Sequence, residues 1–512
     1  MASIARTRRP DAADDLQISA PGDASGARRL QRAAKSGVLL RVAGRIYIRN
    51  GSREDLSLRV RSQWQNIAGA LYPGAVVSHL SAFKGGITAE GLLMLSHPSS
   101  FNRKRALPGG LTIVLMKGPG RLPQDIALGS SGLYWSSRAR TLLENLGASR
   151  TFPLKRAGRD KVEERLTSIL NASGAVELNR VRDHARQLVG ALDANREFKA
   201  LDSIIGALLG TRAKGRIKTR MGRLVAAGTP ADAERMTRFN LLADALRNAV
   251  LPAIADVAAG GAAKIHFAFL ESYFSNFVEG TKFSIQEAQD IVLRNRIVKS
   301  RPKDSHDVLG VFAIANHAGF RDTLPAPGEA FVAGLRDRHK RMLSTRPEAN
   351  PGELKLERNF AGSTEFVSPG LVRGTLQEGS AIALSAPEGL ARAIFYAFLI
   401  AEVHPFTDGN GRLSRLLMNA ELSRVGACRV IIPTLFHPQT IDCLKVLTRE
   451  NHPDPFIKAI ARMARWCAKF QYAQLPELLK AMTACNAFEE SLARFRLKNA
   501  DGSALKARGN TE

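Results

Sequence analysis

The chain of 512 residues has few cysteines, few aromatic side chains and no long apolar run. Its four cysteines lie far apart without CxxC spacing, which argues against a disulfide framework or a zinc site and favours reduced thiols in a cytoplasmic protein. No apolar run approaches the roughly 18 residues that a membrane-spanning helix needs, so we expect no membrane partner. The opening residues MASIARTRRPDAADD have no apolar core and do not form a secretory signal. The absence of GxxxxGK[ST] excludes a P-loop nucleotide site.

Acidic residues are also scarce, since 47 Asp and Glu stand against 74 Lys and Arg, a net charge of +27. Residues 1–250 hold 41 basic and 20 acidic residues, a net charge of +21, whereas residues 251–512 hold 33 and 27, a net charge of +6. The basic excess therefore lies in the N-terminal half, where it indicates a nucleic-acid partner. A basic surface that only aids solubility is the alternative.

The segment HPFTDGNGRLSR, residues 404–415, lies between two apolar stretches. Apolar side chains at helical spacing and on the other faces of 390–403 predict a buried helix. Pro405 disfavours helical geometry at His404, so this helix should end there. Turn-forming residues follow, and apolar spacing from Leu413 onward predicts a second helix. The segment is therefore predicted to be a helix, a tight loop and a helix.

Residues at the start of the second helix suit a bound phosphate. Unpaired backbone N–H groups at a helix N-terminus attract anions, and Gly409 and Gly411 let that backbone approach closely. Arg412 and Arg415 are three residues apart, so we expect them to share a helix face and to reach phosphate oxygens together.

Two further residues of the loop supply the chemistry of group transfer. Asp408 is a hard oxygen ligand suited to Mg²⁺, and His404 can accept a proton from an attacking hydroxyl near neutral pH. A surface loop that happens to be rich in Gly, Asn and Asp is the alternative. The number of positions with defined chemical roles favours a site for nucleotide phosphoryl transfer.

At these residues the chain resembles the Fic family, whose signature is HxFx[D/E]GNGRxxR. The matching residues are His404, Phe406, Asp408, Gly409, Asn410, Gly411, Arg412 and Arg415. The resemblance implies a mostly α-helical Fic fold and a protein adenylyltransferase, which transfers AMP from ATP to a Ser, Thr or Tyr hydroxyl of a target protein and releases pyrophosphate. Related Doc-type kinases carry a lysine in place of the second glycine, so Gly411 favours nucleotidyl transfer over phosphate transfer.

The resemblance also implies a role for each residue of the loop. His404 is the general base, and Asp408 holds Mg²⁺. Asn410 and the glycine amides bind the α-phosphate region, Arg412 and Arg415 hold the outer phosphates, and the phenylalanine anchors the loop in the core.

The upstream segment YFSNFVEGTK, residues 273–282, fits the family's inhibitory motif [S/T]xxxE[G/N] through Ser275, Glu279 and Gly280. Residues four apart share one face of a helix, and a solvated or capping Ser–Glu pair is the alternative. The resemblance implies a salt bridge from Glu279 to Arg415, with which ATP would bind in a non-productive pose. Some relatives use this glutamate to remove AMP from modified targets, and the sequence leaves such deAMPylation open.

The segment GELKLERNFAGSTEFVSP, residues 352–369, predicts a β-hairpin. The resemblance places here a flap that pairs with the target chain as an added strand, and an ordinary surface hairpin is the alternative. The candidate flap residues are Gly362, Ser363, Thr364, Glu365, Phe366 and Val367. Ile441 and Asp442 stand where the family often has two tyrosines near adenine, which leaves strict preference for ATP open.

The N-terminal pattern combines a basic helix at residues 25–36, with Ser25 as a candidate cap, and a basic hairpin around Gly44. Candidate DNA contacts are Arg28, Arg29, Arg32, Lys35, Arg41 and Arg45. This layout is typical of a winged helix. GVLLRVAGRIYIRN, followed by VVSHLSAFKGGI at residues 76–87, resembles the AbiEi-type antitoxin and regulator family, which implies a winged helix joined to a mixed α/β region and regulation of transcription.

We therefore predict a multidomain α+β protein with a winged-helix N-terminus, a mixed α/β region and a mostly helical C-terminal Fic fold with a β-hairpin flap. The predicted segments are a flexible N-terminus at 1–14, a winged-helix-like domain at 15–75, an AbiEi-like region at 76–210, a basic linker at 211–235, an inhibitory-helix region at 236–300, a Fic domain at 301–490 and a flexible tail at 491–512. The alternative function is a DNA-binding regulator or toxin–antitoxin component whose Fic half is a sensor or is silent. Oligomeric state and target protein are not readable from the sequence.

Overall fold

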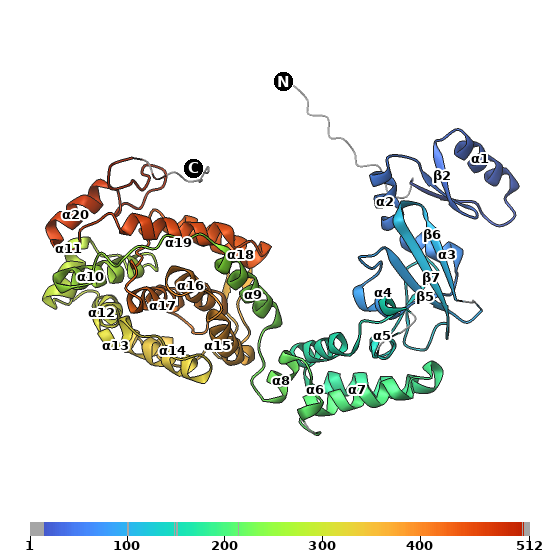
Figure 1. Ribbon diagram of the computed structural model, residues 1–512, viewed down its shortest axis with the longest axis horizontal. Helices are drawn as coiled ribbons and strands as arrows, with labels where there is room; N and C mark the ends of the chain where they lie inside the picture. Colours follow the sequence, from blue (N-terminus) through green and yellow to red (C-terminus); the bar gives the residue numbers. More distant parts are fainter. Residues whose placement is uncertain are drawn as a thin grey trace. The chain divides into compact units, whose positions relative to one another are not determined.

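A computed structural model describes residues 15–99, 102–147, 149, 152–212, 214–503 and 505. The chain divides into two compact units, Met1–Ala227 and Gly228–Glu512 (Figure 1). The predicted flexible N-terminus at 1–14 and the end of the predicted tail at 506–512 lie outside the described residues. Among the helices of the described ranges, none combines the length and apolar character that crossing a membrane requires.

The first unit begins with a small antiparallel sheet in the order β1-β3-β2 and one helix. Its elements are β1 (Leu16–Ile18), α1 (Ala24–Lys35), β2 (Leu39–Ala43) and β3 (Ile46–Arg49). The hairpin turns at Gly44, whose φ of 53° favours glycine. Asp23, rather than Ser25, caps α1 by accepting a hydrogen bond from the Gly26 backbone N–H at 2.8 Å. A single helix precedes the hairpin among the described residues, and the winged helix remains a prediction.

The same unit contains a six-stranded mixed sheet in the order β6-β7-β5-β4-β9-β8. Its strands are β4 (Val76–Val77), β5 (Leu92–His97), β6 (Arg103–Leu107), β7 (Leu111–Lys117), β8 (Ile126–Ala127) and β9 (Tyr134–Trp135). The helices are α2 (Arg53–Ser62), α3 (Trp64–Leu71), α4 (His79–Lys84), α5 (Arg138–Asn145), α6 (Arg159–Leu192), α7 (Asn195–Leu208) and α8 (Arg220–Ala226). Buried residues of the strands form one core with α2 and α3, and α5, α6 and α7 form another.

The second unit is mostly helical, as predicted. Its helices are α9 (Ala233–Asn248), α10 (Gly261–Phe277), α11 (Ile285–Arg294), α12 (Pro302–Asn316), α13 (Ala318–Arg321), α14 (Glu329–Met342), α15 (Pro369–Ala383), α16 (Leu390–Val403), α17 (Asn410–Arg424), α18 (His437–Glu450), α19 (Asp454–Cys467) and α20 (Leu475–Ala484). Its strands are β10 (Phe360–Ala361) and β11 (Thr364–Glu365), which pair antiparallel. The mixed α/β architecture with a helical C-terminal half is thus confirmed.

Helices α16 and α17 hold the candidate loop between them (Figure 1). All but two residues of α16 are buried, as its apolar faces predict, and His404 ends the helix with a φ of 52°. Part of the predicted flexible tail is packed, because Leu497 is buried and the Lys498 carbonyl accepts a hydrogen bond from Trp466 Nε1 at 2.8 Å.

Candidate functional site

A pocket of about 280 Å³ lies where α16 and α17 meet. Its lining includes Glu279, Thr364, Phe366, His404, Thr407, Asp408, Gly409, Asn410, Gly411, Arg415 and His437, together with apolar residues of α16 to α19. The structure therefore brings the loop, the upstream glutamate and the hairpin to one place, although they are far apart in the sequence.

The imidazole of His404 lies half-buried in this pocket. Its Nδ1 lies 3.3 Å from the Ala401 carbonyl oxygen. A carbonyl only accepts hydrogen bonds, so Nδ1 carries the proton and Nε2 keeps its lone pair. The ring stacks on Phe366 at 3.8 Å between centroids. Burial lowers the pKa of His404 to about 4, which leaves the ring able to accept a proton at neutral pH.

The loop is held from inside by Asn410 and Phe406. Asn410 Oδ1 accepts from the Phe406 N–H at 2.9 Å, and Asn410 Nδ2 donates to the Phe406 carbonyl at 2.8 Å. The acceptor and one donor of the Asn410 side chain are therefore used within the loop, and the phosphate contact that the resemblance implies stays a prediction. The ring of Phe406 is fully buried, as expected, and stacks on His339 at 3.8 Å.

The two glycines of the loop lie in tight spaces for different reasons. Gly409 has a φ of 79°, and a Cβ there would lie 2.8 Å from Met342 Cε. A Cβ at Gly411 would lie 2.0 Å from Glu279 Oε1. The Glu279 carboxylate thus occupies the space beside the first turn of α17. The N-terminus of a helix is a place where anions bind.

Arg415 is held by the residues of the upstream motif. Its Nη2 donates to Glu279 Oε1 at 2.7 Å and to the Ser275 carbonyl at 2.9 Å, and its Nε donates to Ser275 Oγ at 3.0 Å. Burial alone would raise the pKa of Glu279, but the Arg415 guanidinium outweighs burial and lowers that pKa below its usual value. Glu279 lies in the turn after α10 rather than within a helix, and Gly280 follows with a φ of 100°.

Arg412 has other partners than Arg415, and the prediction that both arginines reach phosphate oxygens stays a prediction. Its side chain is 4% exposed and does not line the pocket. Arg412 Nη2 lies 2.9 Å from Asp408 Oδ2, and Nη1 lies 3.6 Å from Asp307 Oδ2 on α12. These two carboxylates hold the Arg412 guanidinium, which is still close enough to Glu279 to contribute to the lowered pKa of that carboxyl.

Asp408 presents one carboxylate at the rim of the pocket. Its side chain is 60% exposed, with Oδ1 accepting from the Gly409 N–H at 2.6 Å and Oδ2 paired with Arg412. No cluster of three or more potential metal-ligating side chains occurs within the described ranges. A single exposed carboxylate fits Mg²⁺, which keeps several waters and takes its other ligands from substrate phosphates.

The predicted hairpin is present, but each strand has only two residues. Gly362 has a φ of 59° in its turn, next to Ser363, and Arg449 Nη2 donates to Thr364 Oγ1 at 2.8 Å. Glu365 is exposed, whereas Val367 is buried, so Val367 cannot present a side chain to a target.

Two residues near the site, His339 and Lys355, were not predicted. His339 Nε2 lies 3.0 Å from the Asp408 carbonyl oxygen, and its Nδ1 accepts from the Gly352 N–H at 2.9 Å. The buried Lys355 donates to Asn359 Oδ1 at 2.5 Å, and burial lowers the pKa of Lys355 to about 8. Each is a single residue distant from the loop in sequence, without a local motif that could reveal it.

Known proteins resemble the part of the chain that contains this site. Residues 332–422 match the family model described as Fic/DOC family. Protein adenylyltransferase Fic of Drosophila persimilis is 26% identical over 240 residues, which cover 44% of this chain and 46% of that protein. The protein of the same name from Drosophila grimshawi is 28% identical over 198 residues, covering 38% and 40%. The chain thus spans less than half the length of these curated relatives.

A solved structure of Fic-1 from C. elegans is 18% identical and has a TM-score of 0.34, covering 64% of this chain and 88% of that chain. The family model covers α16, the loop after it and α17 as far as Leu422. Residues 332–422 are therefore identified as a Fic/DOC family domain.

Proposed function

We propose that this chain is a protein adenylyltransferase that transfers AMP from ATP to a Ser, Thr or Tyr hydroxyl of a target protein, and that Glu279 restrains it. One observation carries the proposal: the neutral His404, the glycine amides at the start of α17 and Arg415 line one pocket. The curated relatives named protein adenylyltransferase Fic support the same activity.

In the proposed reaction, His404 Nε2 accepts the proton of the target hydroxyl. The hydroxyl oxygen forms a bond to the α-phosphorus, and the bond from that phosphorus to the bridging oxygen of the β-phosphate breaks, which releases pyrophosphate. The N–H groups of the first turn of α17 and the Arg415 guanidinium stabilise the negative charge of the phosphates. Mg²⁺ held by Asp408 would neutralise phosphate charge when bound.

Glu279 competes with the nucleotide for the same groups. Its carboxylate is bonded to Arg415 at 2.7 Å and lies in the space beside Gly411. Two anions at this place repel each other, so the outer phosphates of ATP can reach Arg415 only after Glu279 has moved. The site is therefore proposed to be restrained in the state described.

The hairpin of β10 and β11 is proposed to align the target. Its short strands lie beside the pocket through Ala361, Thr364 and Phe366, and an extended target segment could pair with its main chain. Phe366 stacks on His404, which links the position of this hairpin to the base.

The proposal is tested with ATP labelled at either the α- or the γ-phosphate, incubated with Mg²⁺ and the Glu279→Gly variant. We expect label on protein from α-labelled ATP only. Label from γ-labelled ATP would indicate phosphate transfer and would overturn the proposal, as would the absence of label from both.

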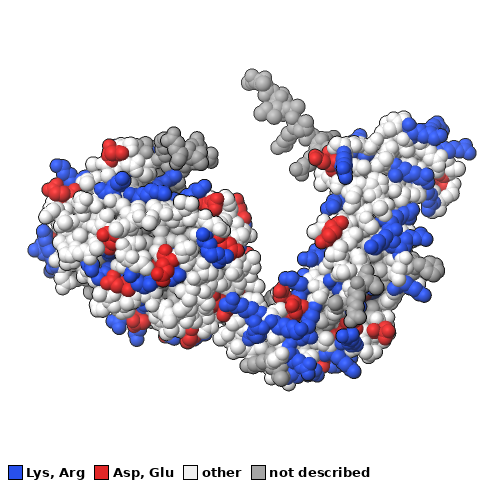
Figure 2. All heavy atoms as spheres, in the orientation of Figure 1, with Lys and Arg blue, Asp and Glu red and all other residues white. Residues whose placement is uncertain are grey.

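A second candidate function concerns the first unit, which we propose binds DNA. Arg28, Arg29, Arg32 and Lys35 of α1 are exposed. Arg41 and Arg45 of the hairpin are exposed as well. Figure 2 shows Lys and Arg side chains spread over this unit with few acidic side chains among them.

The affinity of the chain for a fragment of its own gene's promoter should fall steeply as salt rises and in the Arg28→Ala/Arg32→Ala variant. Binding that is equally strong with this double variant would contradict the assignment.

A further inference from the structure

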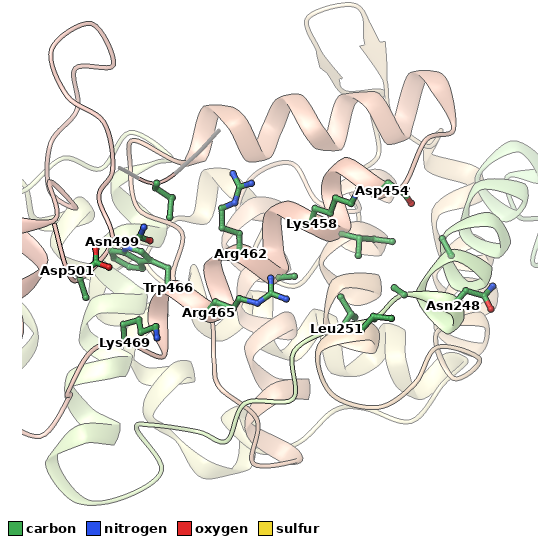
Figure 3. Close-up of a pocket in the computed structure, with 17 residues that line it drawn as sticks. Asn248, Leu251, Asp454, Lys458, Arg462, Arg465, Trp466, Lys469, Asn499 and Asp501 are labelled. Carbon is green, nitrogen blue, oxygen red and sulfur yellow. The ribbon is translucent and has the colours of Figure 1, made fainter. Parts of the chain in front are cut away.

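A second pocket, of about 1400 Å³, lies in the helical unit and shares no lining residue with the pocket around His404. It is bounded by the end of α9, by α19 and by residues 499–501 and 505 (Figure 3). Helix α19 separates the two pockets, because Phe456 and Ile460 face the first one and Ile457 and Ala461 face the second. A ligand in the second pocket would therefore bind outside the proposed catalytic site.

Four cations lie along this pocket at positions i, i+4, i+7 and i+11, so they occupy one face of α19 and its immediate continuation. They are Lys458, Arg462, Arg465 and Lys469, and none of them forms an ion pair with another described residue. Two carboxylates, Asp454 and Asp501, lie at the margins, so the charged residues of the lining sum to +2. Figure 3 places Lys458, Arg462 and Arg465 between Asn248 and Leu251 on one side and Asn499 and Asp501 on the other, with Lys469 on the side of Asn499 and Asp501. The pocket thus presents a net positive charge to an anionic partner.

The pocket also exposes apolar surface. Val250 is 97% exposed and Leu251 is half-buried, both directly after α9. A phosphate chain would use the cations but would leave these apolar side chains in water. Trp466 offers no platform for stacked bases, because it is buried and its Nε1 donates to the Lys498 carbonyl. The combination favours a ligand that carries both carboxylates and apolar side chains.

We infer that this pocket docks an acidic amphipathic helix of a partner protein. Eleven residues separate Lys458 from Lys469, a rise of about 16 Å in a helix, which a partner helix of about twelve residues spans. Carboxylates one helical turn apart would face the cations, and apolar side chains at the same spacing would cover Val250 and Leu251. This binding activity is independent of AMP transfer and places a protein partner on the opposite side of α19 from His404.

The probe is a labelled, end-capped twelve-residue helical peptide with Glu at positions 1, 5, 8 and 12 and Leu on the adjoining face. Its matched control has Gln at the four Glu positions, and a twelve-nucleotide thymidine strand represents a polyphosphate. We expect the full chain to bind the Glu peptide more tightly than either other probe, and we expect this binding to weaken as salt rises.

The test variant is Arg462→Glu/Arg465→Glu, and the matched control is Lys299→Glu/Lys480→Glu, which makes the same charge change at exposed residues outside the pocket. The pocket variant should weaken binding of the Glu peptide about tenfold or more, which corresponds to about 1.4 kcal/mol, and the control should leave it within about twofold. Circular dichroism checks that both variants keep their helix content. The inference would be overturned if both variants lost the same affinity for the Glu peptide. It would also be overturned if the Gln peptide bound as tightly as the Glu peptide, or if the thymidine strand bound more tightly.

Discussion

Replacing Glu279 with glycine should release Arg415 and raise the rate of AMP transfer. The substitution removes the carboxylate that bonds Arg415 Nη2 at 2.7 Å and that fills the space beside Gly411. Ser275 would still contact the arginine through its hydroxyl and carbonyl, so the side chain should remain near its present position. The variant therefore frees a site for phosphate without removing a residue of the loop.

The size of the effect follows from the ion pair that is lost. Arg415 is 12% exposed and Glu279 is 35% exposed, so the pair is only partly screened by water. Hydrogen bonds between charged groups contribute about 1.5–3 kcal/mol net, which corresponds to a change of about 10- to 150-fold in the population of a state that lacks the contact. We therefore expect the rate of self-labelling to rise about 10- to 150-fold in Glu279→Gly. Glu279→Gln keeps the shape but loses the charge and should give a smaller increase.

The rate is measured as incorporation of α-labelled AMP into purified protein at fixed ATP and Mg²⁺. Glu353→Gly is the matched control, because Glu353 also pairs with an arginine, Arg336, at 2.7 Å but lies outside the pocket. It should leave the rate unchanged. A rate for folded Glu279→Gly that equals the rate of the unsubstituted chain would refute the restraint.

Three further predictions follow from the packing of the loop. Gly409→Ala places a Cβ at a φ of 79° and against Met342, so the free energy of unfolding should fall by about 1–3 kcal/mol in denaturant titrations. His339→Phe keeps a ring against Phe406 but leaves the Gly352 N–H without its acceptor, so both the melting temperature and the transfer rate should fall. Unchanged values would contradict a role of His339 in stabilising the loop. Burial lowers the pKa of His404 and of His437 to about 4 from an unfolded value near 6.5. The stability that these neutral rings contribute is present above about pH 6.5 and is lost as the pH falls towards 4, which thermal unfolding across that range can detect.

The sequence predicted those parts of the fold that depend on local patterns. Apolar periodicity and Pro405 predicted α16 and its end at His404, because both signals act within a few residues. Cap geometry was less predictable, since Asp23 rather than Ser25 caps α1. The hairpin was predicted to be longer than the two-residue strands of the structure.

The candidate site shows where sequence patterns stop being informative. The signature identified the loop, and the pocket contains most of its predicted residues. The present partners of Arg412 and Asn410 were not predicted, because Asp307 lies on another helix and because the Asn410 amide bonds within the loop. His339 could not be predicted because its contacts with the loop depend on tertiary packing.

The central claim is that this pocket transfers AMP and that Glu279 restrains it. The most direct test is the intact mass of Glu279→Gly after incubation with ATP and Mg²⁺, compared with the same chain carrying His404→Ala. We expect a gain of one or more AMP groups in the first protein and none in the second. A gain of phosphate alone, or an AMP adduct that persists without His404, would contradict it.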